Sequence, residues 1–251
     1  MTQKVNAIAN GYAILKLLAS QTAARGVTEI AKSTSISPSS CFNILRTLVD
    51  LDLAIFNEKT KGYTLGPGIF ELARNGMSYD TIVTAAQPVL TALAQKHNAT
   101  LGLWDIVNQS EAMLIAMGEN SSLARLSMQI GSRQPIAAGA TGRANLSMRA
   151  DDNDTSWLES KFKEVQWQGE LSFNDYLKDI KRARKRGYGV DRDKYYLGIS
   201  TVSSAFNNAK TGRRYCLTAV LLSGAHSAKT IDAVGHELLS EAETLSNYFL
   251  K

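Results

Sequence analysis

The sequence predicts an α+β protein, and three observations support this fold class. Helical patterns fill residues 1–51, two short strand-like runs follow them, and strand-like and helical runs alternate from residue 99 to the end. The chain has 251 residues, of which 44% are apolar and 20% charged, so it can form a core and is not a disordered protein. This length suits one large domain or two ordinary ones.

The first two helices are expected before residue 36. Within residues 1–20, apolar side chains recur at steps of three and four, and the amphipathic helix that they predict has an apolar stripe of Ile8, Tyr12, Leu15, Leu18 and Ala19. Gly26 breaks the pattern. Thr28 is placed to cap a short second helix, because a threonine hydroxyl accepts a hydrogen bond from the free amides of a helix start.

The third helix has two contrasting faces. Ser37 is expected at its N-cap and Pro38 at its first helical position, where the missing N–H is not needed. The side predicted to be buried holds Phe42, Leu45, Leu48 and Val49. The opposite stripe is polar and consists of Ser39, Asn43, Arg46 and Asp50, with Ser40 and Thr47 beside it. Such side chains suit base edges and phosphates in a major groove, and they also suit a plain solvated face.

A hairpin pattern after this helix favours the first of these two interpretations. Residues 53–56 and 63–65 read as short strands, and the polar loop between them ends in Gly62. Lys59 and Lys61 lie at the expected hairpin tip, where they could contact backbone phosphates. Three helices and a hairpin are the outline of a winged helix-turn-helix. The predicted DNA contacts are Thr28, Ser37, Ser39, Ser40, Asn43, Arg46, Thr47, Lys59 and Lys61.

The charge distribution agrees with a polyanionic partner. The net charge is +5, and residues 1–66 contain seven basic and four acidic side chains. A single module of this kind covers only roughly 600–1,000 Å² of protein surface on DNA. We therefore expect double-stranded DNA with a palindrome-like site, bound by a homodimer or a dimer of dimers.

The remainder of the chain alternates strands and helices. After the turn at 66–68, helices are expected at 69–77 and 79–97, with Pro88 as a kink or restart point. Strands are expected at 101–107, 112–117, 202–206 and 216–223, and helices near 139–149, 154–164, 173–186 and 229–249. This alternation is typical of α+β and of α/β domains, at a size that suits a sensor domain.

Several segments resemble the IclR-type transcriptional regulators. Residues 5–18, 27–31, 44–48 and 62–67 resemble their N-terminal half, residues 131–146 resemble a G-x-R-x-P…A-x-G-K-A-x-L segment, and residues 186–191 resemble R-x-x-G-Y-x-x-D. The resemblance implies a winged helix-turn-helix at 1–66, a linker helix at 67–80, and a GAF-like effector-binding and oligomerisation domain at 81–251. It also implies a repressor, more often than an activator, of catabolic genes that responds to a small organic acid or an aromatic compound.

The resemblance further implies an effector pocket. Carried over residue by residue, its positions fall at Ala140, Thr141, Asp191, Thr201 and Ser223, with Leu126 and Met128 as apolar walls on a preceding strand. The chain departs from the family pattern at Thr201, Lys194 and Leu221, so the effector cannot be taken from a relative. A DNA-binding protein that has lost its effector response is therefore a further alternative.

The pocket residues themselves indicate a ligand chemistry. Free amides at 138–141 would attract an anion at a helix start, and the hydroxyls of Thr141, Thr201 and Ser223 could donate to the same carboxylate. Asp191 would suit a ligand hydroxyl, amide or amine. Trp104 could stack on a ring or be ordinary core.

Other signals are weaker or absent. The basic run at 178–186 reads as a solvated helix face, the three histidines lack metal-ligand spacing, and two distant cysteines indicate a reducing cytoplasm. No leader or membrane-span pattern is seen, and no cofactor or catalytic motif is found. We therefore expect a cytoplasmic protein that is not an enzyme. The alternative is a small-molecule enzyme whose N-terminal helices serve only in oligomerisation.

Overall fold

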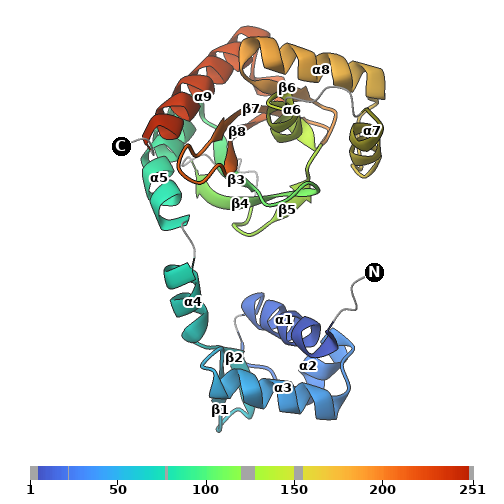
Figure 1. Cartoon of the computed structure of the whole chain (residues 1–251), viewed down its shortest axis with the longest axis vertical. Helices are drawn as coiled ribbons and strands as arrows, with labels where there is room; N and C mark the ends of the chain where they lie inside the picture. Colours follow the sequence, from blue (N-terminus) through green and yellow to red (C-terminus); the bar gives the residue numbers. More distant parts are fainter. Residues whose placement is uncertain (1–4, 22, 77–78, 120–127, 150–154, 249–251) are drawn as a thin grey trace. The chain divides into compact units, whose positions relative to one another are not determined.

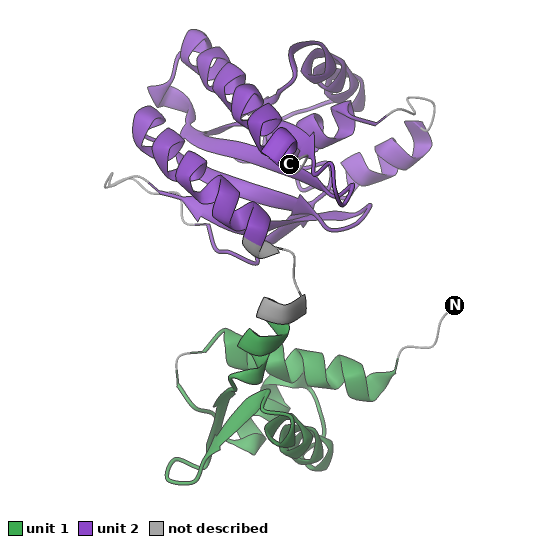
Figure 2. Ribbon diagram, turned by 60° about the vertical axis from the view of Figure 1, so that its left-hand side comes forward, with its two compact units in different colours: residues 1–78 green, residues 79–251 purple. Residues whose placement is uncertain are grey.

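The computed structural model describes residues 5–21, 23–76, 79–119, 128–149 and 155–248. The chain divides into two compact units, residues 1–78 and residues 79–251, which are coloured separately in Figure 2. The elements of both units are labelled in Figure 1. We describe each unit by itself.

Unit 1 is a winged helix-turn-helix, as the sequence predicts. Its elements are α1 (Asn6–Ala19), α2 (Val27–Thr34), α3 (Pro38–Asp50), β1 (Ala54–Asn57), β2 (Gly62–Leu65) and α4 (Gly68–Gly76). The strands β1 and β2 pair antiparallel and form the wing. Helices α1, α2 and α3 enclose a core that contains Ile14, Ile30 and Leu45, each with 0% of its surface exposed.

The start of α3 follows the sequence prediction, but the start of α2 does not. Ser37 is the N-cap of α3, its hydroxyl accepts from the amide of Ser40 at 3.3 Å, and Pro38 is the first helical residue. Gly26 is the N-cap of α2, with no side-chain cap. Thr28 is not a cap, because the chain turns helical at Val27 and this threonine already lies inside the first turn.

The predicted buried faces of α1 and α3 are partly wrong. Of the stripe predicted for α1, Leu18 is buried and Leu15 packs against the core, but Ile8 and Tyr12 are 73% and 64% exposed, because the packed face of α1 also contains Ile14. Phe42 is 45% exposed, because it lies at the margin of the α3 face that packs against the core. Apolar side chains of unit 1 therefore contribute to its surface as well as to its core.

Unit 2 is built on one antiparallel sheet. Its strand order is β5-β4-β3-β8-β7-β6, and every neighbouring pair is antiparallel. The strands are β3 (Thr100–Ile106), β4 (Glu111–Gly118), β5 (Arg133–Pro135), β6 (Gly189–Arg192), β7 (Ile199–Asn207) and β8 (Arg214–Leu222). The sequence reading missed the two edge strands, β5 and β6, which have only three and four residues.

Helices cover both faces of this sheet, as Figure 1 shows. The helices of unit 2 are α5 (Tyr79–His97), α6 (Gly139–Ser147), α7 (Thr155–Lys163), α8 (Phe173–Arg186) and α9 (Ala228–Tyr248), with a short 3-10 turn, η1 (Ser223–Ala225), before α9. Pro88 lies inside α5 and does not end it. Among the described helices, none is long and apolar enough to cross a bilayer.

The two faces of the sheet differ in character. Leu101, Leu103 and Leu217 point to the face where α5 and α9 supply the main apolar core. Because side chains alternate along a strand, Gly102 and Trp104 of β3 point to the opposite face, where α6 packs. Residues 139–146 of α6 are all buried. The polar face that α6 covers is where the cavity described below is found.

Candidate functional site

The outer face of α3 is polar and open. Ser39, Asn43 and Arg46 are all exposed. Neither Asn43 nor Arg46 makes a side-chain hydrogen bond or an ion pair with another residue that the structure describes. Ser40 and Thr47 bond locally, to Ser37 Oγ at 2.8 Å and to the carbonyl of residue 43 at 3.1 Å. The face therefore presents unused donors and acceptors to solvent.

The wing places two cations on the surface of the same unit. Lys59 and Lys61 are exposed in the turn between β1 and β2. The turn is held by Asn57, whose Oδ1 accepts from the amides of Lys59 at 2.9 Å and Thr60 at 3.1 Å. Thr28 is exposed on α2. The positions of Lys59 and Lys61 agree with the hairpin tip expected from the sequence.

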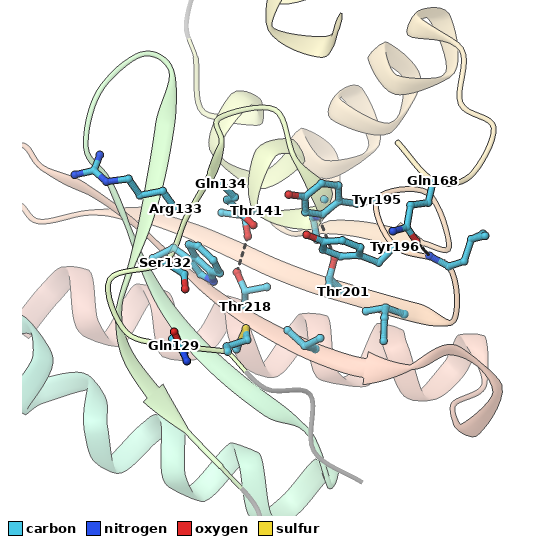
Figure 3. Close-up of a pocket in the computed structure, with 17 residues that line it drawn as sticks. Gln129, Ser132, Arg133, Gln134, Thr141, Gln168, Tyr195, Tyr196, Thr201 and Thr218 are labelled. Atoms are coloured by element: carbon cyan, nitrogen blue, oxygen red, sulfur yellow. Dashed lines mark hydrogen bonds between the residues drawn. The ribbon is translucent and has the colours of Figure 1, made fainter. Parts of the chain in front are cut away.

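Unit 2 contains a cavity of about 610 Å³, shown in Figure 3. Its walls come from β3, β7, β8, the start of α6 and the loop at 193–198. Five residues expected at an effector pocket line it, namely Trp104, Met128, Ala140, Thr141 and Thr201. Residues that the sequence reading did not single out also line it, among them Gln134, Gln168, Tyr195, Tyr196, Leu197 and Thr218.

A chain of hydroxyl groups runs from the cavity into the sheet. Thr141 Oγ1 lies 2.9 Å from Thr218 Oγ1, which lies 2.8 Å from Ser203 Oγ, and all three residues are buried. The first of these contacts is the dashed line between the two threonines in Figure 3. Thr201 Oγ1 accepts from the amide of Ala140 at 3.1 Å. Thr201 therefore anchors the start of α6 and already uses one of the amides expected to face a ligand.

Asp191 lies behind the cavity wall and does not line it. It is 2% exposed, and its Oδ2 accepts from Arg143 Nη1 at 2.7 Å. Its Oδ1 accepts from the amides of Lys194 and Tyr195 at 3.2 and 3.1 Å. In this arrangement Asp191 fixes the loop that carries Tyr195.

Arg143 joins three elements behind that wall. It is completely buried on α6, donates to Asp191 of β6 and to Asp179 of α8, and also donates to the carbonyl of Gly139. Its guanidinium lies over the rings of Trp167 and Tyr176, at 5.6 and 5.0 Å from their centroids. The sequence signal for this residue is that it is the one charged side chain in the run 137–146.

The other predicted pocket residues lie elsewhere. Ser223 begins η1, its Oγ lies 2.9 Å from Ser200 Oγ, and it does not line the cavity. Leu126 is outside the described residues. Met128 lines the cavity but is not part of a strand. Of the departures from the family pattern, Leu221 belongs to the core on the opposite face of the sheet.

Two adjacent tyrosines form one wall. The rings of Tyr195 and Tyr196 have centroids 4.3 Å apart, and in Figure 3 they lie one above the other. Burial, together with a hydrogen bond to Tyr196, raises the pKa of Tyr195 above its ordinary value, so its hydroxyl is neutral. The available signal was an aromatic pair directly after a charged turn at 191–194.

The cysteines and His97 are in environments typical of structural roles. Burial raises the pKa of the Cys216 thiol to about 12, and it also raises the pKa of the Cys41 thiol. His97 lies 2.9 Å from Glu237. Among the described residues, no cluster of three or more His, Cys, Asp or Glu side chains could hold a metal. The basic residues of α8 expected on a solvated face are exposed, apart from the half-buried Arg186.

An open polar helix in a winged unit, and a ligand-sized cavity in a second unit, define a DNA-binding regulator that takes a small molecule. Comparison with known proteins agrees with this class. The family model for the IclR helix-turn-helix domain matches residues 7–55, and the model for the C-terminal domain of bacterial IclR transcriptional regulators matches residues 76–247. The chain belongs to the IclR family of transcriptional regulators.

Relatives of known name are similar over most of their length. The HTH-type transcriptional repressor AllR of Escherichia coli (strain K12) is 26% identical over 90% of this chain and 82% of its own. The acetate operon repressor of Salmonella typhimurium (strain LT2) is 25% identical over 93% and 85%.

Solved structures show the same fold. An IclR transcriptional regulator from Alicyclobacillus acidocaldarius has a TM-score of 0.78 at 20% identity and covers 98% of this chain and 100% of its own. An IclR homologue from Microbacterium hydrocarbonoxydans, solved in complex with 4-hydroxybenzoate, also has a TM-score of 0.78, at 14% identity over 96% and 99%.

Proposed function

We propose that this regulator is a repressor of catabolic genes. In this proposal α3 reads a palindrome-like operator in the major groove, and a small organic acid or an aromatic compound occupies the cavity of unit 2. Both named relatives are repressors, and one structural neighbour holds an aromatic acid.

The open face of α3 is the observation that carries the proposal. Asn43 and Arg46 are exposed and have no partner among the described residues, so their hydrogen-bonding groups are available to bases. Asparagine pairs with adenine, arginine pairs with guanine, and each good pair contributes about 1–3 kcal/mol of discrimination against a wrong base. Serine and threonine hydroxyls beside them suit phosphates.

The assembly of the proposal is a homodimer or a dimer of dimers. One reading head on its own covers too little DNA for useful specificity. Val5, the N-cap of α1, and Ile8 and Tyr12 within this helix are spaced three and four residues apart and are 61–73% exposed. An apolar stripe of this size on a single copy favours self-association, because burying it removes apolar surface from water.

The proposed coupling runs through the segment between the two recognition regions. We retain residues 1–66 as the DNA-binding domain, 67–80 as the linker helix and 81–251 as the effector-binding and oligomerisation domain, although the boundary between the compact units falls at residues 78 and 79. Effector binding has to favour one arrangement of the DNA-binding domains of the assembly over another. Such coupling free energies are typically about 1–3 kcal/mol.

Two substitutions on α3 test the function. Asn43→Ala and Arg46→Ala are expected to weaken binding to a labelled duplex spanning the region upstream of the chain's own gene, by about tenfold each, measured by fluorescence anisotropy. Lys181→Ala, at an exposed position of α8, is the matched control and should bind the duplex as the unaltered protein does. Equal affinity of all variants would remove α3 as the reading helix. A DNA affinity with no salt dependence, together with turnover of a cavity ligand, would favour an enzyme instead.

A further inference from the structure

The cavity contains one buried hydrogen-bond donor that the described protein leaves unused. Trp104 is 7% exposed, and its indole N–H has no hydrogen-bond partner among the described residues. Buried indole N–H groups usually find a partner, and leaving one without a partner costs free energy. Because Trp104 lines the cavity, a bound molecule can supply the missing acceptor.

The strand register places this donor beside the hydroxyl chain. A Cβ added to Gly102 would lie 3.0 Å from Trp104 Nε1, so the indole nitrogen is directly above that glycine. Gly102 pairs with Thr218 of β8, and directly opposed side chains in a sheet are close neighbours. Thr218 in turn contacts Thr141 at 2.9 Å. The indole N–H and two hydroxyls therefore meet at one end of the cavity.

The hydroxyl chain can present a proton to the same place. Ser203, Thr218 and Thr141 have three hydroxyl hydrogens and only two contacts between them. When Ser203 donates to Thr218 and Thr218 donates to Thr141, the Thr141 hydroxyl is left to donate into the cavity. A negatively charged ligand selects this direction, because hydroxyl groups rotate to suit their acceptors.

The surroundings favour negative charge at this end. Thr141 lies in the first turn of α6, where the helix dipole is positive, and no described lining residue is a carboxylate. Arg133 lies at the cavity rim and is ion-paired with Glu111 at 2.8 Å, so it is not a second anchor inside. Tyr195, Tyr196 and Val220 add aromatic and apolar surface to the wall, beside neutral polar side chains such as Gln134 and Gln168.

We propose that Trp104 determines effector specificity through its indole N–H. One carboxylate oxygen of a planar monocarboxylate accepts from Trp104 Nε1, the other accepts from Thr141 Oγ1, and the aromatic wall holds the planar body. This inference rests on the proposed function only in placing the effector in this cavity. It assigns Trp104 a polar role, beyond the stacking or core role that the sequence left open.

The test uses the full chain and benzoate as the probe, with benzamide as its neutral match. Isothermal titration is expected to give tighter binding of benzoate than of benzamide, because hydrogen bonds to a charged acceptor are the stronger kind. Trp104→Phe keeps an aromatic ring and removes the N–H, and it should weaken benzoate binding about tenfold or more. Thr141→Val should also weaken it, whereas Thr141→Ser should restore most of the affinity.

Trp157→Phe is the matched control. Trp157 lies on α7, with the Arg149 guanidinium 4.0 Å from its ring centroid, and does not line the cavity, so benzoate affinity should stay within about twofold. Unchanged benzoate affinity in a folded Trp104→Phe protein would overturn the role of the N–H. Tighter binding of benzamide, or no benzoate binding by a protein that still binds its upstream DNA, would overturn the carboxylate class. Loss of DNA binding under all conditions would instead count against the proposed function.

Discussion

The reading face of unit 1 and the cavity of unit 2 recognise their partners by different physical means. On α3, Asn43 and Arg46 are exposed and have no side-chain partner among the described residues, so they can be changed while the core stays intact. In unit 2, the hydroxyls of Thr141 and Thr218 in the cavity and the Arg143–Asp191 pair behind its wall are buried, and the two members of each pair are bonded to each other. Recognition and stability are therefore separable in unit 1 and linked in unit 2.

The largest effect is expected where this linkage is strongest. Arg143→Met should lower the free energy of unfolding of unit 2 by about 3–5 kcal/mol, because it leaves Asp191 as a buried charge without its main partner. All three tryptophans (Trp104, Trp157 and Trp167) belong to unit 2, so urea unfolding followed by tryptophan fluorescence reports this unit alone.

Arg182→Ala is the control for this prediction. Arg182 is an exposed arginine that also pairs with Asp179, at 3.1 Å, and its loss should cost less than about 1 kcal/mol. Similar free energies of unfolding for Arg143→Met and Arg182→Ala would contradict the conclusion that unit 2 depends on its buried Arg143–Asp191 pair.

A second prediction concerns the exposed side chains of α1, which are apolar, whereas the exposed face of α3 is polar. Ile8→Glu should shift the protein toward monomers in analytical ultracentrifugation, since it places a charge in the proposed self-association surface. DNA affinity should then fall by about 100-fold or more, because one reading head loses the effective concentration supplied by the other. Leu222→Glu, at an exposed apolar position of unit 2, should change neither measurement. A dimeric Ile8→Glu protein would place self-association elsewhere.

The smallest effect is expected at the wing. Lys59→Ala and Lys61→Ala should each reduce the slope of log affinity against log salt by about 1, and should weaken binding to every duplex to a similar degree. Lys185→Ala on α8 should leave the slope unchanged. A change confined to one DNA sequence would mean that the wing reads bases as well as phosphates.

Local signals made unit 1 largely predictable. The serine–proline start of α3 and its polar stripe depend on neighbours within one helix, and the wing depends on one short loop. The errors at Ile8, Tyr12 and Phe42 share one cause. A helical period shows that apolar stripes exist, but the neighbouring helices decide which stripe is covered, and α1 has more apolar residues than one side can bury.

The cavity was predictable only in part. The resemblance places Ala140, Thr141 and Thr201 in one pocket, and all three line the cavity. Thr218 and Trp104 meet through pairing between β3 and β8, which are far apart in sequence, and no periodicity reveals that register. Asp191 faces Arg143 instead of the cavity, because it pairs with this buried guanidinium. Sequence patterns do not show which buried charges pair.

The loop at 193–198 has a practical consequence. Its backbone is fastened from behind by Asp191 and from the side by Gln168, whose Oε1 accepts from the amide of Leu197 at 3.0 Å. Yet Tyr196 and Leu197 are 47% and 62% exposed at the mouth of the cavity. Replacing these two side chains should alter which molecules enter without loosening the framework. An engineer building a biosensor from this chain would randomise Tyr196 and Leu197 first and leave the floor of the cavity unchanged.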